Sequence, residues 1–326
     1  MKKVDVVIPN YNGLKYLKGC FSSLFAQREA PDFQVILVDN GSDDGSVAWT
    51  REHYPQVHMI ELDHNTGFCH AVNLGILAGE GEYVVLLNND TRCHELFLKS
   101  LWERMEEDRP GRLFSASACM LDWQDETILD GAGDNYMLFG WPYARGKGRK
   151  ACVYDKSVGI FSACGGAAIY RRSVLEEIGL FDENHFAYLE DVDIGYRANI
   201  AGYDNCYEPK ARVIHYGSGT SGSRYNSWKT AIVAENSVYL VYKNMPFLQW
   251  LINAPFLFLG KLIKWLFFCK KGMGREYLRG LLKGLKKSIS KEGRNHKVRF
   301  KIKNIPHYLR IEGAMILNTV RFLKKS

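Results

Sequence analysis

The chain has 326 residues, 46% hydrophobic and 24% charged, which is typical of a globular protein and excludes disorder, collagen-like repeats or a small disulfide scaffold for the whole chain. The net charge of +7 combines 24 basic and 33 acidic residues before Met245 with 19 basic and 3 acidic residues from Met245 onward. An acidic body with a basic C-terminal part predicts an anionic partner surface, either a membrane or a nucleic acid.

The first 90 residues alternate strand-like and helix-like patterns. Short apolar runs at residues 4–8, 35–38 and 83–87 alternate with helical spacing over residues 14–25 and after Gly67. This alternation predicts a parallel sheet with helices on both faces, whose ligand crevice lies beyond the carboxyl ends of the strands. Three of these strand ends carry Asn or Asp, which is the first indication of a site.

The middle of the chain is less regular. Residues 113–216 are rich in glycine, which predicts a long loop region that lies over the sheet and carries substrate-binding segments. A helix is expected from Glu190, with Asp193 and Arg197 spaced for an i,i+4 pair, and another over residues 229–243.

The C-terminal part combines apolar, aromatic and basic residues. Between Lys243 and Lys261 lie 17 uncharged residues, but two prolines and two amides interrupt them, so we expect no membrane-spanning helix there. Residues 279–287 alternate basic and apolar side chains, which predicts a helix in a membrane interface. Packing on the body or on a second protomer is the alternative, and no recognisable module favours nucleic acid.

The cysteines and the N-terminal residues indicate in which cellular compartment the protein is expected. The eight cysteines are widely spaced without a C-x-x-C pair, so they predict no zinc site and suggest reduced thiols in a cytosolic protein. The first residues lead directly into a strand pattern, which predicts no signal peptide. We therefore expect a cytoplasmic protein, peripheral on the inner face of the plasma membrane.

Two strand ends carry candidate carboxylates. Asp90, after Asn88 and Asn89, is placed to hold a divalent cation that a diphosphate already chelates, or else to cap the following helix. Asp39 is placed to accept hydrogen bonds from a ribose or a base edge, or else to stabilise a turn. Spacing alone does not separate these alternatives.

Carboxylates also gather at the start of the helix that begins at Glu190. Glu190 and Asp193 share one helix face and Asp191 points elsewhere, so the group either stabilises the helix N-terminus or supplies a general base. His215 follows an apolar run and precedes the Gly-Ser-rich residues 217–222, and a lone histidine in such a place is more often structural than a ligand.

Seven ordered motifs between residues 4 and 220 carry a family resemblance. They occupy residues 6–13, 38–46, 65–68 with Asn73 and Gly75, 86–91, 165–167, 181–183, and 188–193 with Arg197 and Gly202. Their order and spacing resemble the family 2 glycosyltransferases of the GT-A fold, particularly the bacterial rhamnosyltransferase-like branch. The resemblance implies an α/β fold with a mostly parallel mixed sheet flanked by helices.

The resemblance also implies domains and roles. The catalytic domain is expected over residues 1–244, with a nucleotide-sugar half to about 112 and an acceptor half beyond it, followed by a helical membrane-associating region over residues 245–326. The implied roles are donor binding by Pro9, Tyr11, Asp39, Asn65, Asn73, Asn89 and Asp90, the acceptor side at Gly165 and Gly166, metal binding by Asp90 and His215, and catalysis by Asp191 with Glu190 beside it. The first acidic position of the family's D-x-D motif is Asn88 here, so cation binding would depend on Asp90 and His215.

The implied reaction is an inverting transfer of a sugar from a nucleotide diphosphate, with Mg²⁺ or Mn²⁺ as the cation. The branch suggests dTDP-rhamnose as donor and a lipid-linked or polysaccharide glycan as acceptor, such as a polyprenyl-diphosphate oligosaccharide, in cell-surface polysaccharide synthesis. The expected partners are the donor, the acceptor and an anionic membrane, and no nucleic acid. A sugar-phosphate nucleotidylyltransferase and a non-catalytic sugar-binding or scaffold protein are the alternatives.

Overall fold

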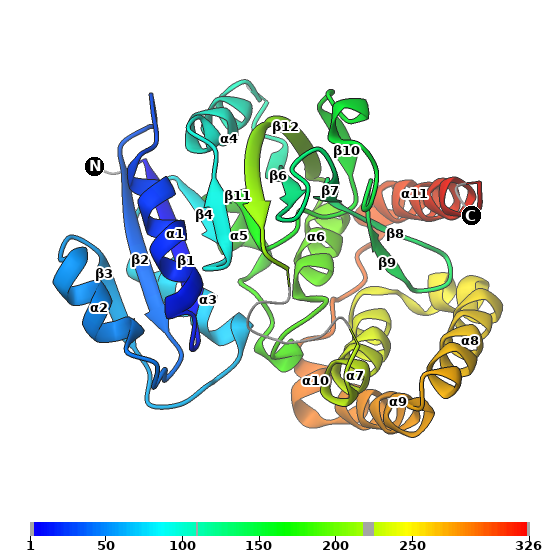
Figure 1. Cartoon of the computed structure of the whole chain (residues 1–326). Helices are drawn as coiled ribbons and strands as arrows, with labels where there is room; N and C mark the ends of the chain where they lie inside the picture. The colour runs from blue at the N-terminus through cyan, green and yellow to red at the C-terminus, as the bar shows by residue number, and fades with distance from the viewer. Residues whose placement is uncertain (1–2, 109, 218–224, 325–326) are drawn as a thin grey trace.

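The structure is a computed structural model that describes residues 3–108, 110–217 and 225–324 (Figure 1). Apart from Gly217, the Gly-Ser-rich residues 217–222 that follow His215 in the sequence lie outside these described residues.

One large mixed sheet organises the protein. Its strands follow the order β10-β12-β6-β11-β4-β1-β2-β3, with β5 paired to β12 and β7 paired to β6. They are β1 (Val4–Asn10), β2 (Phe33–Asp39), β3 (His58–Glu61), β4 (Tyr83–Leu87), β5 (Thr91–Cys93), β6 (Leu113–Asp122), β7 (Leu129–Gly131), β10 (Val158–Ile160), β11 (Ala167–Arg171) and β12 (Asp204–His215). The β4-β1-β2-β3 half is parallel, β12 pairs in parallel with β6, and β11 joins the two halves through antiparallel pairs.

Helices cover both faces of the sheet. They are α1 (Leu14–Phe25), α2 (Ser46–His53), α3 (Phe68–Ala78), α4 (Phe97–Glu106), α5 (Arg172–Ile178), α6 (Glu190–Ala201), α7 (Ser227–Asn244), α8 (Phe247–Lys270), α9 (Gly274–Ile289), α10 (Lys291–Asn295) and α11 (Ile305–Leu323). Successive strand residues point to opposite faces, so Val6 packs with α1 and α4 while Val7 packs with α3. Burial on both faces explains the continuous apolar runs of the first strands. The predicted α/β class and mixed, mostly parallel sheet are therefore confirmed.

The middle of the chain is more ordered than the sequence indicated. Instead of one long loop region, it supplies β6, β10, β11 and β12, which form half of the main strand order (Figure 1). The separate hairpin of β8 (Asp134–Tyr136) and β9 (Pro142–Ala144) lies in the same stretch. The prediction of a long loop over residues 113–216 was wrong in this respect, because small and polar residues occupy these buried strands.

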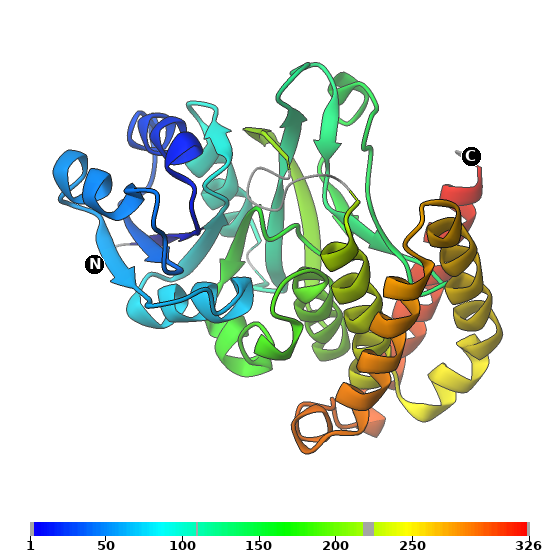
Figure 2. The ribbon, with the colours of Figure 1, turned by 60° about the horizontal axis from the view of Figure 1, so that its bottom comes forward.

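The C-terminal helices pack on the body. α9 lies along α7, and α11 contacts α6 and β8 (Figure 2). A hydrophobic cluster joins Tyr196 of α6, Leu240 of α7, Leu257 of α8 and Ile311 of α11. The described residues of the C-terminal part, 245–324, therefore share a core with the rest of the chain, and the domain boundary at residue 244 stays a prediction.

α8 differs from its predicted form. It is one 24-residue helix that continues through Pro255, and it is long and apolar enough to cross a membrane by length and composition. The expectation of a segment too short and broken for such a helix was therefore wrong. Pro255 lies in the third turn, and the helix continues on both sides of it although proline has no backbone N–H to donate. Length and composition alone are weak evidence for a membrane span.

Candidate active site

A cavity of about 410 Å³ opens at the carboxyl ends of β1 and β4. Its lining combines residues from both halves of the sheet with the start of α6 and of α7. The lining residues are Pro9, Asn10, Tyr11, Asn40, Asn65, Gly67, Phe68, Asn88, Asn89, Asp90, Cys164, Gly165, Gly166, Phe186, Ala187, Tyr188, Glu190, Asp191, His215, Trp228 and Lys229. Most residues predicted for the site therefore meet in one cleft.

A buried amide network fixes the floor of the cleft. Asn10 donates hydrogen bonds from Nδ2 to Asp39 (2.8 Å) and Ser46 (2.9 Å), and its Oδ1 accepts one from Asn89 (2.7 Å). Gly13 lies so close that an added Cβ would come within 2.0 Å of the Asn89 amide nitrogen. The ends of β1 and β4 are thus locked together before any ligand binds.

A carboxylate–histidine group stands at the end of β12. The Nε2 atom of His215 lies 3.3 Å from Asp90 Oδ1, and Nδ1 lies 2.8 Å from Asp130 Oδ2. Burial opposes the charged ring, but the hydrogen bonds to Asp130 and Asp90 raise the pKa of His215 to about 9. Burial also opposes ionisation of Asp130, yet hydrogen bonds from His215 and Lys147 lower its pKa to about 2.

This geometry suits a divalent cation. Asp90 and His215 both line the cleft, and a second carboxylate on Nδ1 leaves Nε2 to face it. Such a carboxylate–histidine arrangement orients metal-ligating histidines in general. The sequence analysis missed Asp130 because it lies 85 residues from His215, in a stretch without a motif.

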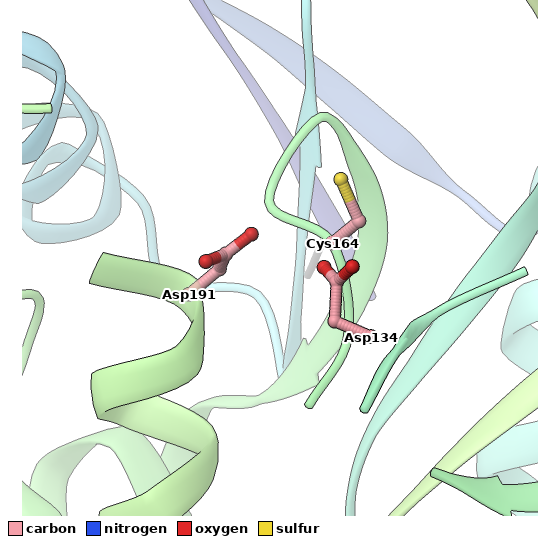
Figure 3. A group of neighbouring side chains, drawn as sticks. All are labelled: Asp134, Cys164 and Asp191. Atoms are coloured by element: carbon pink, nitrogen blue, oxygen red, sulfur yellow. The ribbon is translucent and has the colours of Figure 1, made fainter. Parts of the chain in front are cut away.

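Asp191 lies beside a second carboxylate and a thiol (Figure 3). One ligand atom each of Asp134, Cys164 and Asp191 lies within 4.8 Å of the other two. Asp191 stands in the first turn of α6, Asp134 begins β8, and Cys164 precedes β11. A smaller hollow, whose lining includes Asp134, Asp191 and the β9 residues, adjoins this group.

Burial and neighbouring charges raise the pKa values of the carboxyl groups around Asp191. Burial raises the pKa of Asp191 to about 6, although backbone hydrogen bonds from Val192 and Gly165 act to lower it. Burial, followed by the nearby charge of Asp191, holds the pKa of Glu190 and of Asp134 well above the ordinary range. Near neutral pH, Asp191 is therefore the ionised member of the group and the one suited to accept a proton.

A strained segment positions the start of α6. Phe186, Tyr188 and Leu189 have φ values of 59°, 68° and 71°, which side chains other than glycine rarely adopt. The fully buried amide of Asn236 on α7 donates to the carbonyls of His185, Ala187 and Tyr188 at 2.8–2.9 Å. Such strain persists only where the surroundings hold it, and it is typical of functional sites.

Replacing Asn236 tests whether its hydrogen bonds to the carbonyls of residues 185–188, which we call the Asn236 clamp, hold the strained segment in place. We expect Asn236→Leu to lower the free energy of unfolding by about 2–4 kcal/mol, because several buried carbonyls lose their donor. Transfer should fall as well, since Glu190 and Asp191 follow the strained segment directly. Denaturant unfolding and initial rates measure the two effects. The exposed Asn295→Leu is the control, and an Asn236→Leu protein with unaltered stability would contradict the clamp.

Two predicted donor residues lie outside the described lining. Asp39 is buried beneath the cleft, where it accepts hydrogen bonds from Asn10 and from the Ser42 backbone (2.8 Å each). Asn73 binds the Phe181 backbone through both ends of its amide, at 2.8 and 3.0 Å. Their contacts support the cleft from behind. The sequence analysis did not assign Trp228 or Lys229, which no motif marks.

Asp193 belongs to a separate buried network. It pairs with Arg197 at 2.9 Å, as the spacing predicted, and with Lys243 at 2.7 Å. Asp182, His185 and Asp193 also have the proximity of a metal site. The Lys243 ammonium fills that position, 2.7 Å from both Asp182 and Asp193, so the group is an internal ion network.

A larger cavity of about 540 Å³ lies elsewhere, between α11 and the start of β12. It contains arginines and amides but neither the strained segment nor the carboxyl group around Asp191. The chemistry therefore favours the cleft at the ends of β1 and β4.

Comparisons with known proteins agree on family and fold. The model of the family described as Glycosyl transferase family 2 matches residues 5–179, more than half of the chain. The N-acetylglucosaminyl-diphospho-decaprenol L-rhamnosyltransferase of Mycobacterium tuberculosis H37Rv is 29% identical over 242 residues, which cover 67% of this chain and 78% of that protein.

Solved structures share the fold at low identity. GalNAc-T7, solved with UDP, GalNAc and Mn²⁺, is 17% identical with a TM-score of 0.58, covering 74% of this chain and 48% of that one. The mannosyltransferase PcManGT of Pyrobaculum calidifontis, solved with GDP-Man and Mn²⁺, is 16% identical with a TM-score of 0.55, covering 87% of each chain.

Proposed function

The chain belongs to glycosyl transferase family 2 and has the GT-A fold, and from this premise we propose an inverting, metal-dependent transferase that moves a sugar from a nucleotide diphosphate to a glycan hydroxyl. The observation that carries the proposal is that Asp191 and the Asp90–His215 pair line one cleft. A diphosphate bound near Asp90 and an acceptor hydroxyl near Asp191 would then approach the anomeric carbon from opposite sides.

Asp191 acts as the general base. With its carboxylate ionised, it takes the proton of the acceptor hydroxyl as the oxygen attacks the anomeric carbon. The bond from that carbon to the nucleotide diphosphate breaks in the same displacement, which inverts the configuration. Asp134 and Glu190, held protonated by burial and by the charge of Asp191, keep the surroundings neutral.

Asp90 and His215 would hold the cation. A divalent cation supplies Lewis-acid stabilisation to the charge that develops on the leaving diphosphate. The Asp134–Cys164–Asp191 group suits this role less, because burial raises the pKa of the Cys164 thiol well above 9 and a protonated thiol is a poor ligand. The cation is Mg²⁺ or Mn²⁺ on this proposal, and the cleft offers both ions oxygen and imidazole donors.

Donor and acceptor follow by analogy with the mycobacterial rhamnosyltransferase. We take dTDP-rhamnose as the first donor to test and a polyprenyl-diphosphate-linked glycan as the acceptor class, in cell-surface polysaccharide synthesis.

A donor panel tests the function. Incubation with nucleotide sugars and Mn²⁺ should release nucleoside diphosphate with one donor, and chelation should stop the release. Pyrophosphate formation would favour the nucleotidylyltransferase, and loss of all metal-dependent donor binding would favour a scaffold.

Asp130 provides a separate test of the cation site. We expect Asp130→Asn to weaken Mn²⁺ binding by about 10–100-fold, because the substitution removes the charge that orients His215. Calorimetric titration of the protein with Mn²⁺ in the presence of nucleoside diphosphate measures the effect. Asp125→Asn, at an exposed turn nearby, is the control. Equal Mn²⁺ affinity in the two variants would remove Asp130 from the cation site.

The orientation of α8 supports a membrane-facing role. Its inward stripe contains Gln249, Asn253, Leu257 and Gly260, whereas large apolar side chains such as Phe258 remain exposed. The helix thus uses amides and a glycine to pack on the body and leaves its apolar face outward, the reverse of an ordinary surface helix. We propose that α8 lies in the interface of an anionic membrane, assisted by the basic residues of 245–326, with the protein cytoplasmic and peripheral on the inner face of the plasma membrane.

Vesicle binding tests this proposal. Leu248→Ser combined with Phe258→Ser removes two side chains that are 67% and 72% exposed, so the fold should tolerate the change. Binding to phosphatidylglycerol vesicles should weaken by more than about 10-fold, since each buried side chain contributes about 1.5–3 kcal/mol. Leu77→Ser with Val153→Ser, equally exposed elsewhere, is the control. If both double variants sediment with the vesicles to the same extent, α8 is not the membrane-binding element.

A further inference from the structure

Two lysines of α8 turn toward the body of the protein, although the exposed face of the helix is apolar. Lys261 donates a hydrogen bond from Nζ to Ser237 Oγ at 2.5 Å, and Lys264 Nζ lies over the Trp141 ring, 5.3 Å from its centroid. Both side chains are half-buried. They stand three residues apart, so their charges share one side of the helix.

These lysines carry charge without an anionic partner among the described residues. Burial and the neighbouring Lys264 lower the pKa of Lys261 to about 7, and burial lowers the pKa of Lys264 to about 8, with no carboxylate acting in the opposite sense. Two half-buried ammonium groups on one side of a helix are costly unless an anion offsets their charge. The rest of the basic tail lies mostly on the surface, where water solvates it.

The position of the two lysines relative to Asp191 indicates which anion they would bind. Trp228 near the start of α7 lines the donor cleft, Val233 lines the hollow beside Asp191, and Ser237 contacts Lys261. Val233 and Ser237 are four residues apart, about 6 Å along the helix, which is comparable to one sugar ring.

Residues 141–142 also connect the hollow beside Asp191 to the lysines. Pro142 lines the hollow beside Asp191, and the preceding residue Trp141 contacts Lys264. Residues that line the donor cleft, residues that line the hollow beside Asp191 and the contact with Lys261 therefore follow one another along α7. Both lysines belong to α8, whose large apolar side chains are exposed.

We propose that Lys261 and Lys264 form a subsite for the diphosphate of a prenyl-linked glycan acceptor, whose sugar reaches Asp191 while its hydrocarbon chain lies along the apolar face of α8. This inference rests on the proposed function. It makes α8 part of the acceptor site as well as an attachment surface. Phosphate groups are available both from the acceptor and from bulk anionic lipids, so the test must separate the two sources.

Binding of a prenyl diphosphate tests the subsite directly. Full-length protein in detergent and EDTA, which keeps cations out of the donor cleft, is titrated calorimetrically with farnesyl diphosphate and with farnesol. We expect the wild-type protein to prefer the diphosphate, and Lys261→Gln with Lys264→Gln to weaken its binding by about 10-fold or more, since charge-assisted contacts are lost. Lys283→Gln with Lys286→Gln, an exposed pair on α9 with the same spacing, should retain wild-type binding. Equal affinity in the two double variants overturns the subsite.

Two vesicle measurements distinguish a prenyl diphosphate from a bulk anionic lipid as the source of the bound phosphate. Phosphatidylcholine vesicles doped with undecaprenyl diphosphate should bind the wild type better than the Lys261/Lys264 variant, whereas vesicles doped with phosphatidylglycerol should not discriminate between them. Equal discrimination by phosphatidylglycerol would show a general lipid contact and overturn the proposal.

Donor chemistry separates the inference from the proposed function. Metal-dependent release of nucleoside diphosphate without acceptor should persist in the Lys261/Lys264 variant, and its loss there would place the lysines in the donor site or the fold, against the proposal. If wild-type protein reacts with no donor, the proposed function fails, whereas donor release without selective diphosphate binding refutes the subsite alone.

Discussion

Asp191→Asn should reduce sugar transfer by about 10²–10⁴-fold while donor binding persists. The amide has nearly the shape of the carboxylate but cannot accept the proton of the acceptor hydroxyl. The backbone N–H of Val192 donates to Asp191 Oδ1 at 2.7 Å, and the amide oxygen can accept the same bond. The loss should therefore fall on kcat rather than on folding or on the affinity for nucleoside diphosphate.

The pH profile gives this prediction a second readout. Because burial raises the pKa of Asp191 to about 6, the wild-type rate should fall as pH drops through about 6 and the base becomes protonated. The residual rate of Asp191→Asn should lack that acidic limb. Asp63→Asn, at a highly exposed carboxylate, is the control, and near-normal turnover by Asp191→Asn would exclude it as the base.

The strand-end residues were predictable because local patterns carry the information. Apolar runs ending in Asn or Asp placed Asn10, Asn40 and Asp90 at one edge of a parallel sheet, and the structure brings these positions into one cleft. Family motifs then added Asp191 and His215 to the same site. Both kinds of inference use residues close together in the sequence.

The residues that support the site were not predictable in this way. Asn236 clamps a segment about 50 residues earlier in the chain, and Asp130 orients a histidine 85 residues later. Strands β6 and β12 escaped prediction because their buried faces contain serine, alanine and asparagine, as in the Ser115–Asn205 hydrogen bond of 2.7 Å. Tertiary partners stabilise these residues, and hydrophobic periodicity does not report such partners.

The same reasoning explains α8. Its Pro255 and amides indicated a broken segment, yet Asn253 donates to Glu312 of α11 at 2.9 Å and to Gln249 O at 3.0 Å. Amides that interrupt an apolar run in sequence are here the packing residues of the helix. Polar residues in such a run therefore mark which face of the helix turns inward.

Lys243→Met should lower the free energy of unfolding by about 3–5 kcal/mol, because it leaves buried carboxylates without their counter-charge. Lys243 is 3% exposed and lies 2.7 Å from both Asp182 and Asp193. Asp193 retains its ion pair with Arg197, so the larger loss falls on Asp182. The remaining donors to the Asp182 carboxylate include the Tyr239 hydroxyl at 2.8 Å and the Asn184 side-chain amide, neither of which is charged. Denaturant unfolding at pH 7 measures the loss, with the exposed Lys286→Met as the control.

The dependence on pH identifies the cause. Burial opposes ionisation of Asp182, but the Lys243 charge lowers its pKa to about 2, so the pair stabilises the protein above pH 4 and loses that effect as pH falls toward 2. Without Lys243 the pKa of Asp182 should rise, and the difference between variant and wild type should shrink as the carboxyl is protonated. Adding Asp182→Asn to Lys243→Met should recover part of the stability, since the unpaired charge is gone. Lys243 would act through packing alone if the loss of stability in Lys243→Met did not depend on pH and simply added to the effect of Asp182→Asn in the double variant.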